Sequence, residues 1–275
     1  MKTQTIIEPG RSEKNYWRDL WRYRELFYVL SWRDFKVRYS QTVLGVLWVV
    51  IRPLLTMLIF TWLFGRLAKM PFEGAAPYSV MVLAGILPWQ FFANSLSESS
   101  NSLIANERLV SKVYFPRMII PASAVLTNFV DFLFSLFILA ALFVYYGYMP
   151  PVQIAFLPLF AICLLIASMG PALWLTAVMV KFRDFRHLIP FILQVGIFIS
   201  PVGYSSSVIP AEWKWAYSLN PLVGVIDGFR WCIVRGAHNP LLSQSFYISL
   251  SIAILFFYLA ILQFRKMEKT FADVI

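Results

Sequence analysis

This chain has few of the residues from which catalytic and metal centres are built. It holds two cysteines and two histidines, and the members of each pair lie far apart in the sequence (Cys163, Cys232, His187 and His238). None of its twelve glycines lies in a GxxxxGK(S/T) phosphate-binding loop, and neither HExxH nor GxSxG occurs. We therefore predict that the chain is not an enzyme and has no catalytic residue, metal site or cofactor of its own.

Charged residues are also scarce, at 14% of the sequence against 59% hydrophobic residues. Six long apolar runs make up most of the chain, and they lack the alternation typical of membrane β-strands. Each run is near or above the ~20 residues with which a helix crosses the hydrocarbon core. We predict an all-α membrane domain over residues 41–275 with six transmembrane helices, at about 43–64, 78–96, 118–146, 152–180, 188–204 and 246–264.

Acidic residues are outnumbered, because 24 Lys and Arg face 14 Asp and Glu and give a formal net charge of +10. The distribution of the cations argues against nucleic acid as a partner. Eighteen lie in segments expected on one side of the membrane, five on the other side, and one within a span. This asymmetry predicts a cytoplasmic N-terminus, and an even number of spans places the C-terminus on the same side.

The first 40 residues have no short apolar core of the kind found in signal peptides. We expect residues 1–14 to form a disordered cytoplasmic tail. Residues 15–40 mix aromatic rings with cations, as in Trp17, Arg18 and Trp21, which is typical of an amphipathic helix lying in the membrane interface. This interface helix is either a surface anchor alone or part of a cytoplasmic entrance for an amphiphilic substrate.

Two charges, Arg52 and Asp131, lie deep within predicted spans. An ionised side chain at that depth costs ~2.5–3.5 kcal/mol on insertion scales, so each needs a partner. Helical rise places the two residues at similar depths, and we predict that they contact one another. The sequence leaves open whether this pair is structural or belongs to a substrate path.

The predicted cytoplasmic segment 98–117 is polar and charged. We expect a short helix there, capped by Ser100 or Asn101 and ending near Leu109 or Val110. Its exposed charges suit contact with a cytoplasmic partner, although an ordinary solvated loop has the same pattern. These charges are Glu107, Arg108 and Lys112.

The predicted outer segment 205–245 contains helices too short to cross the membrane. Asn220 suits a helix N-cap, Pro221 the first helical position, and Gly236 the end of the same helix. We predict a re-entrant gate at about 208–235, with an interfacial hairpin as the alternative. The candidate gate residues are Trp213, Trp215, Asn220, Pro221 and the mutually neutralising i, i+3 pair Asp227 and Arg230.

Aromatic residues are abundant, at 17% of the chain. Most rings are expected to face lipid, the core or the interfacial belts. Rings within spans or at an outer mouth can instead line a path, where they stack on the C–H faces of sugars. A saccharide is therefore a chemically reasonable cargo. The candidate path residues are Trp48, Arg52, Trp62, Trp89, Asp131, Tyr145 and Tyr146.

Several motifs, in order from about residue 20 to the C-terminus, resemble those of the permeases of polysaccharide-exporting ABC transporters. They are RDFKVRY at 33–39, LGVLW at 44–48, Arg52-Pro53-Leu54, GILPW at 85–89, NERLVSKVYFPR at 106–117, KFRD at 181–184, and Asn220-Pro221 through Arg230. The O-antigen branch of this family is the most similar, and its relatives export capsule or teichoic acid polymers.

The resemblance implies a homodimer in the bacterial inner membrane, with two separate ATPase subunits that bind ATP and Mg. It implies that the N-terminal helix is the interface helix and that the short helices at 208–218 and 221–235 form the periplasmic gate. The expected cargo is a lipid-linked glycan, O-antigen or alternatively capsule or teichoic acid. A small-molecule exporter, a secondary carrier and a membrane enzyme are competing classes. The expected coupling helix, 98–113, carries Asn106, Glu107, Arg108 and Lys112.

Overall fold

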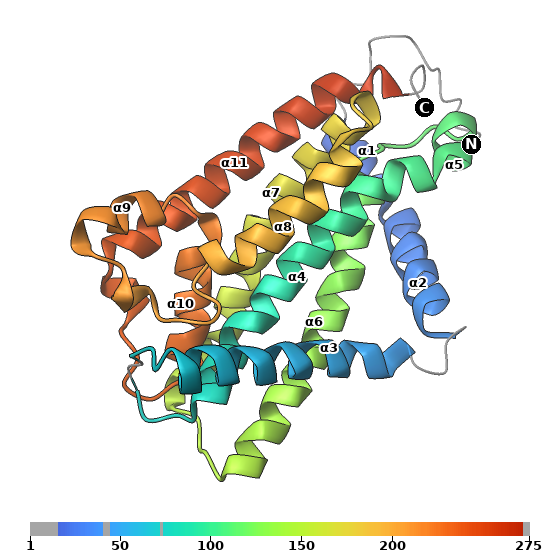
Figure 1. Ribbon diagram of the computed structural model, residues 1–275. Helices are drawn as coiled ribbons and strands as arrows, with labels where there is room; N and C mark the ends of the chain where they lie inside the picture. Colours follow the sequence, from blue (N-terminus) through green and yellow to red (C-terminus); the bar gives the residue numbers. More distant parts are fainter. Residues whose placement is uncertain (1–15, 41–44, 72–73, 272–275) are drawn as a thin grey trace.

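The structure is a computed structural model that describes residues 16–40, 45–71 and 74–271. Within these ranges every regular element is helical, which confirms the predicted all-α fold (Figure 1). The predicted tail at 1–14 and the first two residues of the first predicted span lie outside the described residues. Five helical segments are long and apolar enough to cross a membrane: Leu47–Leu67, Tyr78–Ala105, Ile119–Tyr146, Val152–Lys181 and Gln244–Glu268.

These segments correspond to five of the six predicted spans. The first consists of α3 (Gly45–Phe60) continued by the π-helix η2 (Thr61–Leu67), and the fourth consists of η3 (Val152–Phe156) followed by α7 (Leu157–Lys181). The others are single helices: α4 (Tyr78–Ala105), α6 (Ile119–Tyr146) and α11 (Gln244–Glu268).

The sixth predicted span, 188–204, is a shorter apolar helix, α8 (Phe185–Ile199). At 15 residues it is about 22 Å long, less than the ~30 Å of a bilayer core. The helix ends where Ser200 turns to an extended conformation before Pro201, a residue type that disfavours helix in its predecessor. The structure thus has five helices of crossing length and one short apolar helix, where six full spans were predicted.

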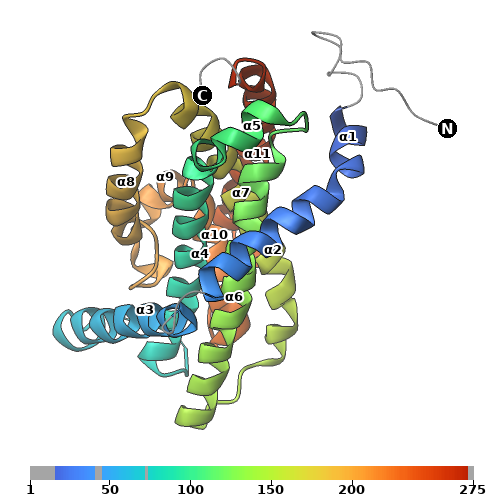
Figure 2. The same ribbon diagram turned by 90° about the vertical axis from the view of Figure 1, so that its right-hand side faces the viewer.

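Helix α4 forms the centre of the molecule and α3 its periphery. Helices α6, α7, α10 and α3 all pack against α4, and 78% of its most apolar window is buried, against 17% for the first span. In both views α3 runs across the direction of α4 and α6, whereas α4, α6 and α7 run side by side (Figures 1 and 2). Most described side chains of α3 are therefore exposed or half-buried on the surface of this single chain.

The predicted interface helix at 15–40 consists of two helices, α1 (Tyr16–Arg22) and α2 (Arg24–Ser40), which join at Tyr23. Helix α2 packs across α6, as Figure 2 shows. Leu30 of α2 is buried in that contact, whereas the tryptophans of these helices are exposed. They are Trp17, Trp21 and Trp32.

The predicted short helix after residue 98 lies further along the chain than expected. Helix α4 continues through Ser100 and Asn101 to Ala105, and the short helix α5 spans Glu107–Lys112. In this stretch the serine hydroxyls have partners although the helix is covered by its neighbours: Ser102 donates to the carbonyl of Ser99 one turn earlier, and Ser99 donates to Pro121 of α6. Asn106, in a non-helical conformation, separates the two helices, so the prediction of a cap at Ser100 or Asn101 was wrong.

The predicted gate segment contains short helical turns, η4 (Ser206–Val208), η5 (Ala211–Trp213) and α9 (Lys214–Tyr217), followed by α10 (Pro221–Ile233). The N-cap prediction is confirmed, because the Asn220 side chain accepts a hydrogen bond from Leu222 N at 3.0 Å. Helix α10 ends two residues before the predicted end. A further turn, η6 (Pro240–Leu242), leads into α11.

Helix α10 is held in the core by close packing against α7. A Cβ on Gly228 would lie 2.0 Å from the Phe160 ring, a distance that real Cβ atoms do not show. Glycine at this position therefore lets the ring of Phe160, itself fully buried, lie against the backbone of α10. Most residues of α10 are buried, so this segment is an internal helix and not a surface hairpin.

Candidate functional site

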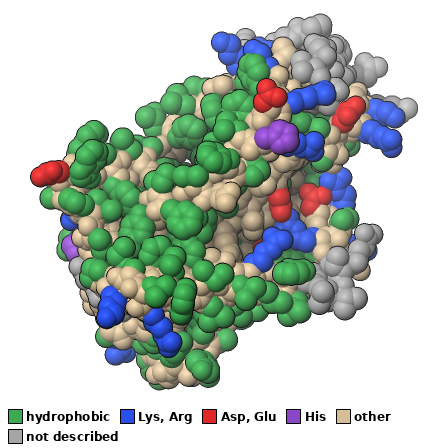
Figure 3. Space-filling view, in the orientation of Figure 1, with side chains coloured by type: hydrophobic (Ala, Val, Ile, Leu, Met, Phe, Trp, Pro, Cys, Tyr) green, Lys and Arg blue, Asp and Glu red, His purple; other side chains and the backbone are tan. Residues whose placement is uncertain are grey.

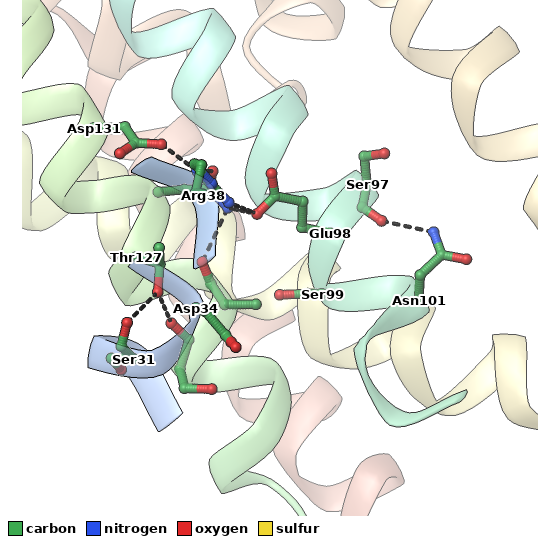
Figure 4. Close-up of polar contacts among 12 residues, drawn as sticks. Ser31, Asp34, Arg38, Ser97, Glu98, Ser99, Asn101, Thr127 and Asp131 are labelled. Carbon is green, nitrogen blue, oxygen red and sulfur yellow. Dashed lines mark hydrogen bonds and ion pairs between the residues drawn. The ribbon is translucent and has the colours of Figure 1, made fainter. Parts of the chain in front are cut away.

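Arg38, near the end of α2, joins three helices through one guanidinium group. Its Nη1 donates to the Asp131 carboxylate on α6 and its Nη2 to the Glu98 carboxylate on α4, both at close range (Figure 4). Asn128 of α6 accepts from Arg38 at 3.1 Å and donates to Glu98 at 2.8 Å, while the Tyr39 hydroxyl donates to Asp131. We call these five residues the charge network.

The charge network is only partly open to solvent. The exposed fraction of the side chain is 27% for Arg38, 41% for Glu98 and 12% for Asp131. Burial disfavours the charged form of Arg38, but the two carboxylates outweigh it and raise the pKa of the guanidinium above its ordinary value. In Figure 3, acidic and basic side chains face one another in a hollow of an otherwise largely hydrophobic face.

The predicted contact between Arg52 and Asp131 is wrong. Asp131 contacts Arg38 and Tyr39, whereas the Arg52 guanidinium lies 5.9 Å from the ring centroid of Trp48 on its own helix. The prediction failed because it considered only the predicted spans. Helix α2 brings a second arginine to the same depth from outside them.

Sequence reasoning also missed Glu98 and Arg38 as site residues. Glu98 lies in the predicted cytoplasmic segment, because the predicted second span ends at residue 96. Arg38 lies in the predicted interface helix, whose cations are expected to face lipid. The sequence does contain an indication of this site: the RDFKVRY motif places Arg38 a few residues before the first predicted span. Continuing the helix past the serines would have placed Glu98 on α4.

A second polar contact joins α2 to Asn106, the residue that directly precedes α5. Arg33 Nη2 donates to the Asn106 side-chain oxygen at 3.0 Å and also pairs with Asp34 at 2.7 Å. The Asn106 amide nitrogen donates to Ser102 O at 2.8 Å, at the end of α4. The predicted coupling charges Glu107, Arg108 and Lys112 are all exposed on α5, and their role in binding a partner stays a prediction.

The predicted path residues do not form one surface in this chain. Trp48 and Trp62 are exposed on the first span, and Tyr145 packs edge-on against Tyr146 at the end of α6. Trp89 is buried, with its ring against Gly196 of α8, so it contributes to packing between α4 and α8. Their shared role in a path stays a prediction.

Arg230 is the main polar group of the predicted gate and is 5% exposed. It donates to the carbonyls of Tyr204 at 2.7 Å and Val202 at 3.0 Å, and its Nη1 lies 3.9 Å from the Asp227 carboxylate. The predicted Asp227–Arg230 pair is therefore confirmed. Burial lowers the pKa of Arg230, although Asp227 opposes this effect. Trp213 and Trp215 are exposed near this site.

Gly85 of α4 makes room for this arginine. A Cβ at Gly85 would lie 2.9 Å from the Val202 carbonyl oxygen and 3.1 Å from Arg230 Nη2. Any larger residue would push apart the groups that hold Arg230. Among the described residues no cluster of three or more His, Cys, Asp or Glu side chains is arranged to hold a metal ion.

Comparison with known proteins places this architecture in a family. Residues 25–234, from α2 to the end of α10, match the family described as ABC-2 type transporter. The chain is 29% identical over 252 residues to the O-antigen export system permease protein RfbA of Klebsiella pneumoniae, covering 91% of this chain and 95% of the relative.

Two further relatives extend the comparison. The O-antigen export system permease protein RfbA of Myxococcus xanthus is 30% identical over 215 residues, 78% of this chain and 82% of the relative. The polysialic acid transport protein KpsM of Escherichia coli is 26% identical over 238 residues, 85% of this chain and 91% of the relative. The chain belongs to the ABC-2 type transporter family, whose membrane permeases work with a separate ATPase subunit.

Proposed function

We propose that this chain is the membrane subunit of an ATP-driven exporter that moves a lipid-linked polysaccharide, O-antigen, across the bacterial inner membrane. The observation that carries this proposal is the similarity to O-antigen export permeases over about nine-tenths of both chains. The similarity to KpsM keeps export of a capsule polymer as the alternative. In this proposal both termini are cytoplasmic, which agrees with the distribution of Lys and Arg.

The ATPase subunit contacts α5 in this proposal. Glu107, Arg108 and Lys112 offer charges of both signs on an exposed helix, which suits a protein partner better than a lipid surface. ATP and Mg bind to the partner, because the chain has no phosphate-binding loop. Movement of α5 then reaches α4 directly through Asn106.

Helix α2 provides the second route for this movement. Arg33 links α2 to Asn106, and Arg38, closer to the end of the same helix, links α2 to α4 and α6. A displacement of α5 therefore acts on two long spans through groups that hold them at separate points. Packed helices linked in this way move as units rather than bending continuously.

A second copy of the chain completes the path. Few residues of the first span are buried in the single chain, and its exposed side chains include Trp48 and Arg52 of α3 and Trp62 of η2. In a homodimer this face can border a shared channel, where exposed rings offer surfaces on which sugar rings stack as the polymer passes. Two ATPase subunits then serve two permease copies.

Deletion of the gene in its own strain tests the proposal. Undecaprenyl-linked glycan is expected to accumulate inside the cell, and surface polymer to disappear, with both restored by the wild-type gene. Loss of capsule with O-antigen intact would favour the alternative. Normal surface polymers, or transport by the reconstituted chain without its ATPase, would rule out the proposed function.

A further inference from the structure

A cavity of about 220 Å³ lies between α9, α10 and the start of α11. In Figure 1 these elements lie at the opposite end of α11 from α5. The cavity is distinct from the charge network, because it shares no residue with it. Its lining combines apolar side chains, such as Met81, Val223 and Pro240, with the hydroxyl groups of Ser205, Ser206, Ser207, Ser218, Ser243 and Ser245.

Arg230 and Asp227 supply a donor and an acceptor side by side in this lining. Arg230 is nine-tenths or more buried, and while its two Nη atoms bind carbonyls, its Nε has no hydrogen-bond partner among the described residues. Less than 1 Å² of this Nε is accessible, so a ligand in the cavity contacts the other atoms of Arg230 that line it.

Two aromatic side chains, Tyr217 and Phe246, complete the lining. Serine hydroxyls and a guanidinium–carboxylate pair match the hydroxyls of a sugar, since each sugar hydroxyl both donates and accepts. The cavity is smaller than the ~300–1,000 Å³ typical of pockets for drug-sized ligands, so it suits one ring and not a chain of them. Asp227 offsets the charge of Arg230, so this pair suits a neutral ligand, while Lys214 adds a cation elsewhere in the lining.

We propose that this cavity, the outer pocket, binds a single neutral glycosyl unit of the exported polymer through Arg230, Asp227 and the serine hydroxyls. The identity of the ligand rests on the proposed function. The outer pocket holds a sugar residue after it has crossed the membrane and so opposes its return. Lys214 and His238 lie at the same lining and suit contact with its outer hydroxyls.

Direct binding tests this proposal independently of export. The probes are methyl glycosides released by methanolysis from the strain's own surface polymer, added to the permease–ATPase complex in nanodiscs without nucleotide. Saturation-transfer NMR is expected to show binding of at least one glycoside. Ser245→Phe, which places a ring in the cavity, is expected to weaken binding at least tenfold.

The matched control is Ser251→Phe, an exposed position on the same helix outside the cavity lining, and it is expected to bind as the wild type does. Asp227→Asn provides a second variant, which keeps the side-chain shape and is expected to weaken binding at least threefold. Both pocket variants are compared at equal ATPase co-purification and equal thermal unfolding midpoint.

Three outcomes would overturn the outer pocket: no glycoside binding to the wild-type complex, binding unchanged in both pocket variants, or displacement of the glycoside by inorganic phosphate. Failure of the proposed function has a different signature, namely normal surface polymer in the deletion strain. Glycoside binding that is lost in Ser245→Phe supports the outer pocket whatever the deletion strain shows about export.

Discussion

Two arginines, Arg38 and Arg230, are both held by several acceptors, but the acceptors differ in kind. Arg38 binds carboxylates on two separate helices, α4 and α6, whereas Arg230 binds backbone carbonyls in the segment that follows α8. The first arrangement depends on three side chains from distant parts of the chain. The second depends on one side chain and a local backbone path.

This difference predicts how each site responds to the loss of its arginine. Removal of Arg38 leaves two carboxylates close together without their shared cation, so the remaining groups repel one another. Removal of Arg230 leaves two neutral carbonyls and one carboxylate, that of Asp227, which lines a cavity that water can enter. The charge network should therefore be the more sensitive site, and the following predictions test that order.

Arg38→Ala is expected to have the largest effect. Because part of the side chain is exposed, we expect a loss of about 3 kcal/mol, at the low end for a broken buried pair. Surface polymer should also disappear, since α2 loses its link to α4 and α6. Thermal unfolding of the purified protein in detergent measures the stability change.

Lys36→Ala, an exposed cation on the same helix, is the control and should change stability by less than about 0.5 kcal/mol. Neutralising the carboxylates in the triple variant Arg38→Met, Glu98→Gln and Asp131→Asn should recover more than half of the loss. If the triple variant is no more stable than Arg38→Ala, carboxylate repulsion is not the cause.

Arg230→Met is expected to cost about 2 kcal/mol, because the carbonyls of Val202 and Tyr204 lose their donors. Hydrogen exchange should increase in α10 and in residues 200–206, with little change in α2. Equal loss of protection in α2 and α10 would show that the two arginine sites are not separate units.

Gly85→Ala tests the packing around Arg230 without removing it. The new Cβ would crowd the Val202 carbonyl and Arg230 Nη2, and we expect a cost of about 1–2 kcal/mol. Gly147→Ala is the comparison, since nothing lies within 4 Å of its added Cβ and only its positive φ of 58° is unfavourable. A cost below about 0.5 kcal/mol at Gly85, the range of an unconstrained site, would contradict the packing argument.

Substitution of both Glu107 and Arg108 by Ala should have the smallest effect on stability, less than about 0.5 kcal/mol, because both side chains are exposed. Co-purification of the ATPase subunit should nevertheless fall several-fold, while membrane insertion stays normal. Arg183→Ala, at an exposed position in the 181–184 segment, is the control. Unchanged docking in the double variant would remove α5 from the ATPase contact.

Local features of the fold were predictable from sequence. Helix α6 begins and ends within one residue of its predicted bounds, because a long apolar run closed by Gly147 leaves little freedom. The start of α10 was predictable too, since Asn220 and Pro221 form a local cap. The Asp227–Arg230 pair follows from helical spacing alone.

Features that depend on distant neighbours were not predictable. The serines after residue 96 look like a loop, yet their hydroxyls bond within α4 while α6 and α7 cover that helix. The predicted span at 188–204 extends beyond the end of α8, because apolar residues continue past Pro201 whereas the helical backbone ends at Ile199. Hydropathy counts residues, whereas helix ends depend on backbone geometry.

The sequence by itself determined that this protein is a helical membrane protein, because long apolar runs and the bias of Lys and Arg are properties of composition and local order. Its motifs, and not its composition, indicated a family whose permeases work with a separate ATPase subunit. Tertiary structure alone decided that Asp131 pairs with Arg38, 93 residues away, and that α3 runs across the bundle. By sequence, Arg38 of α2 and Arg52 of α3 are both candidate partners of the same carboxylate, and only the packing of whole helices selects Arg38.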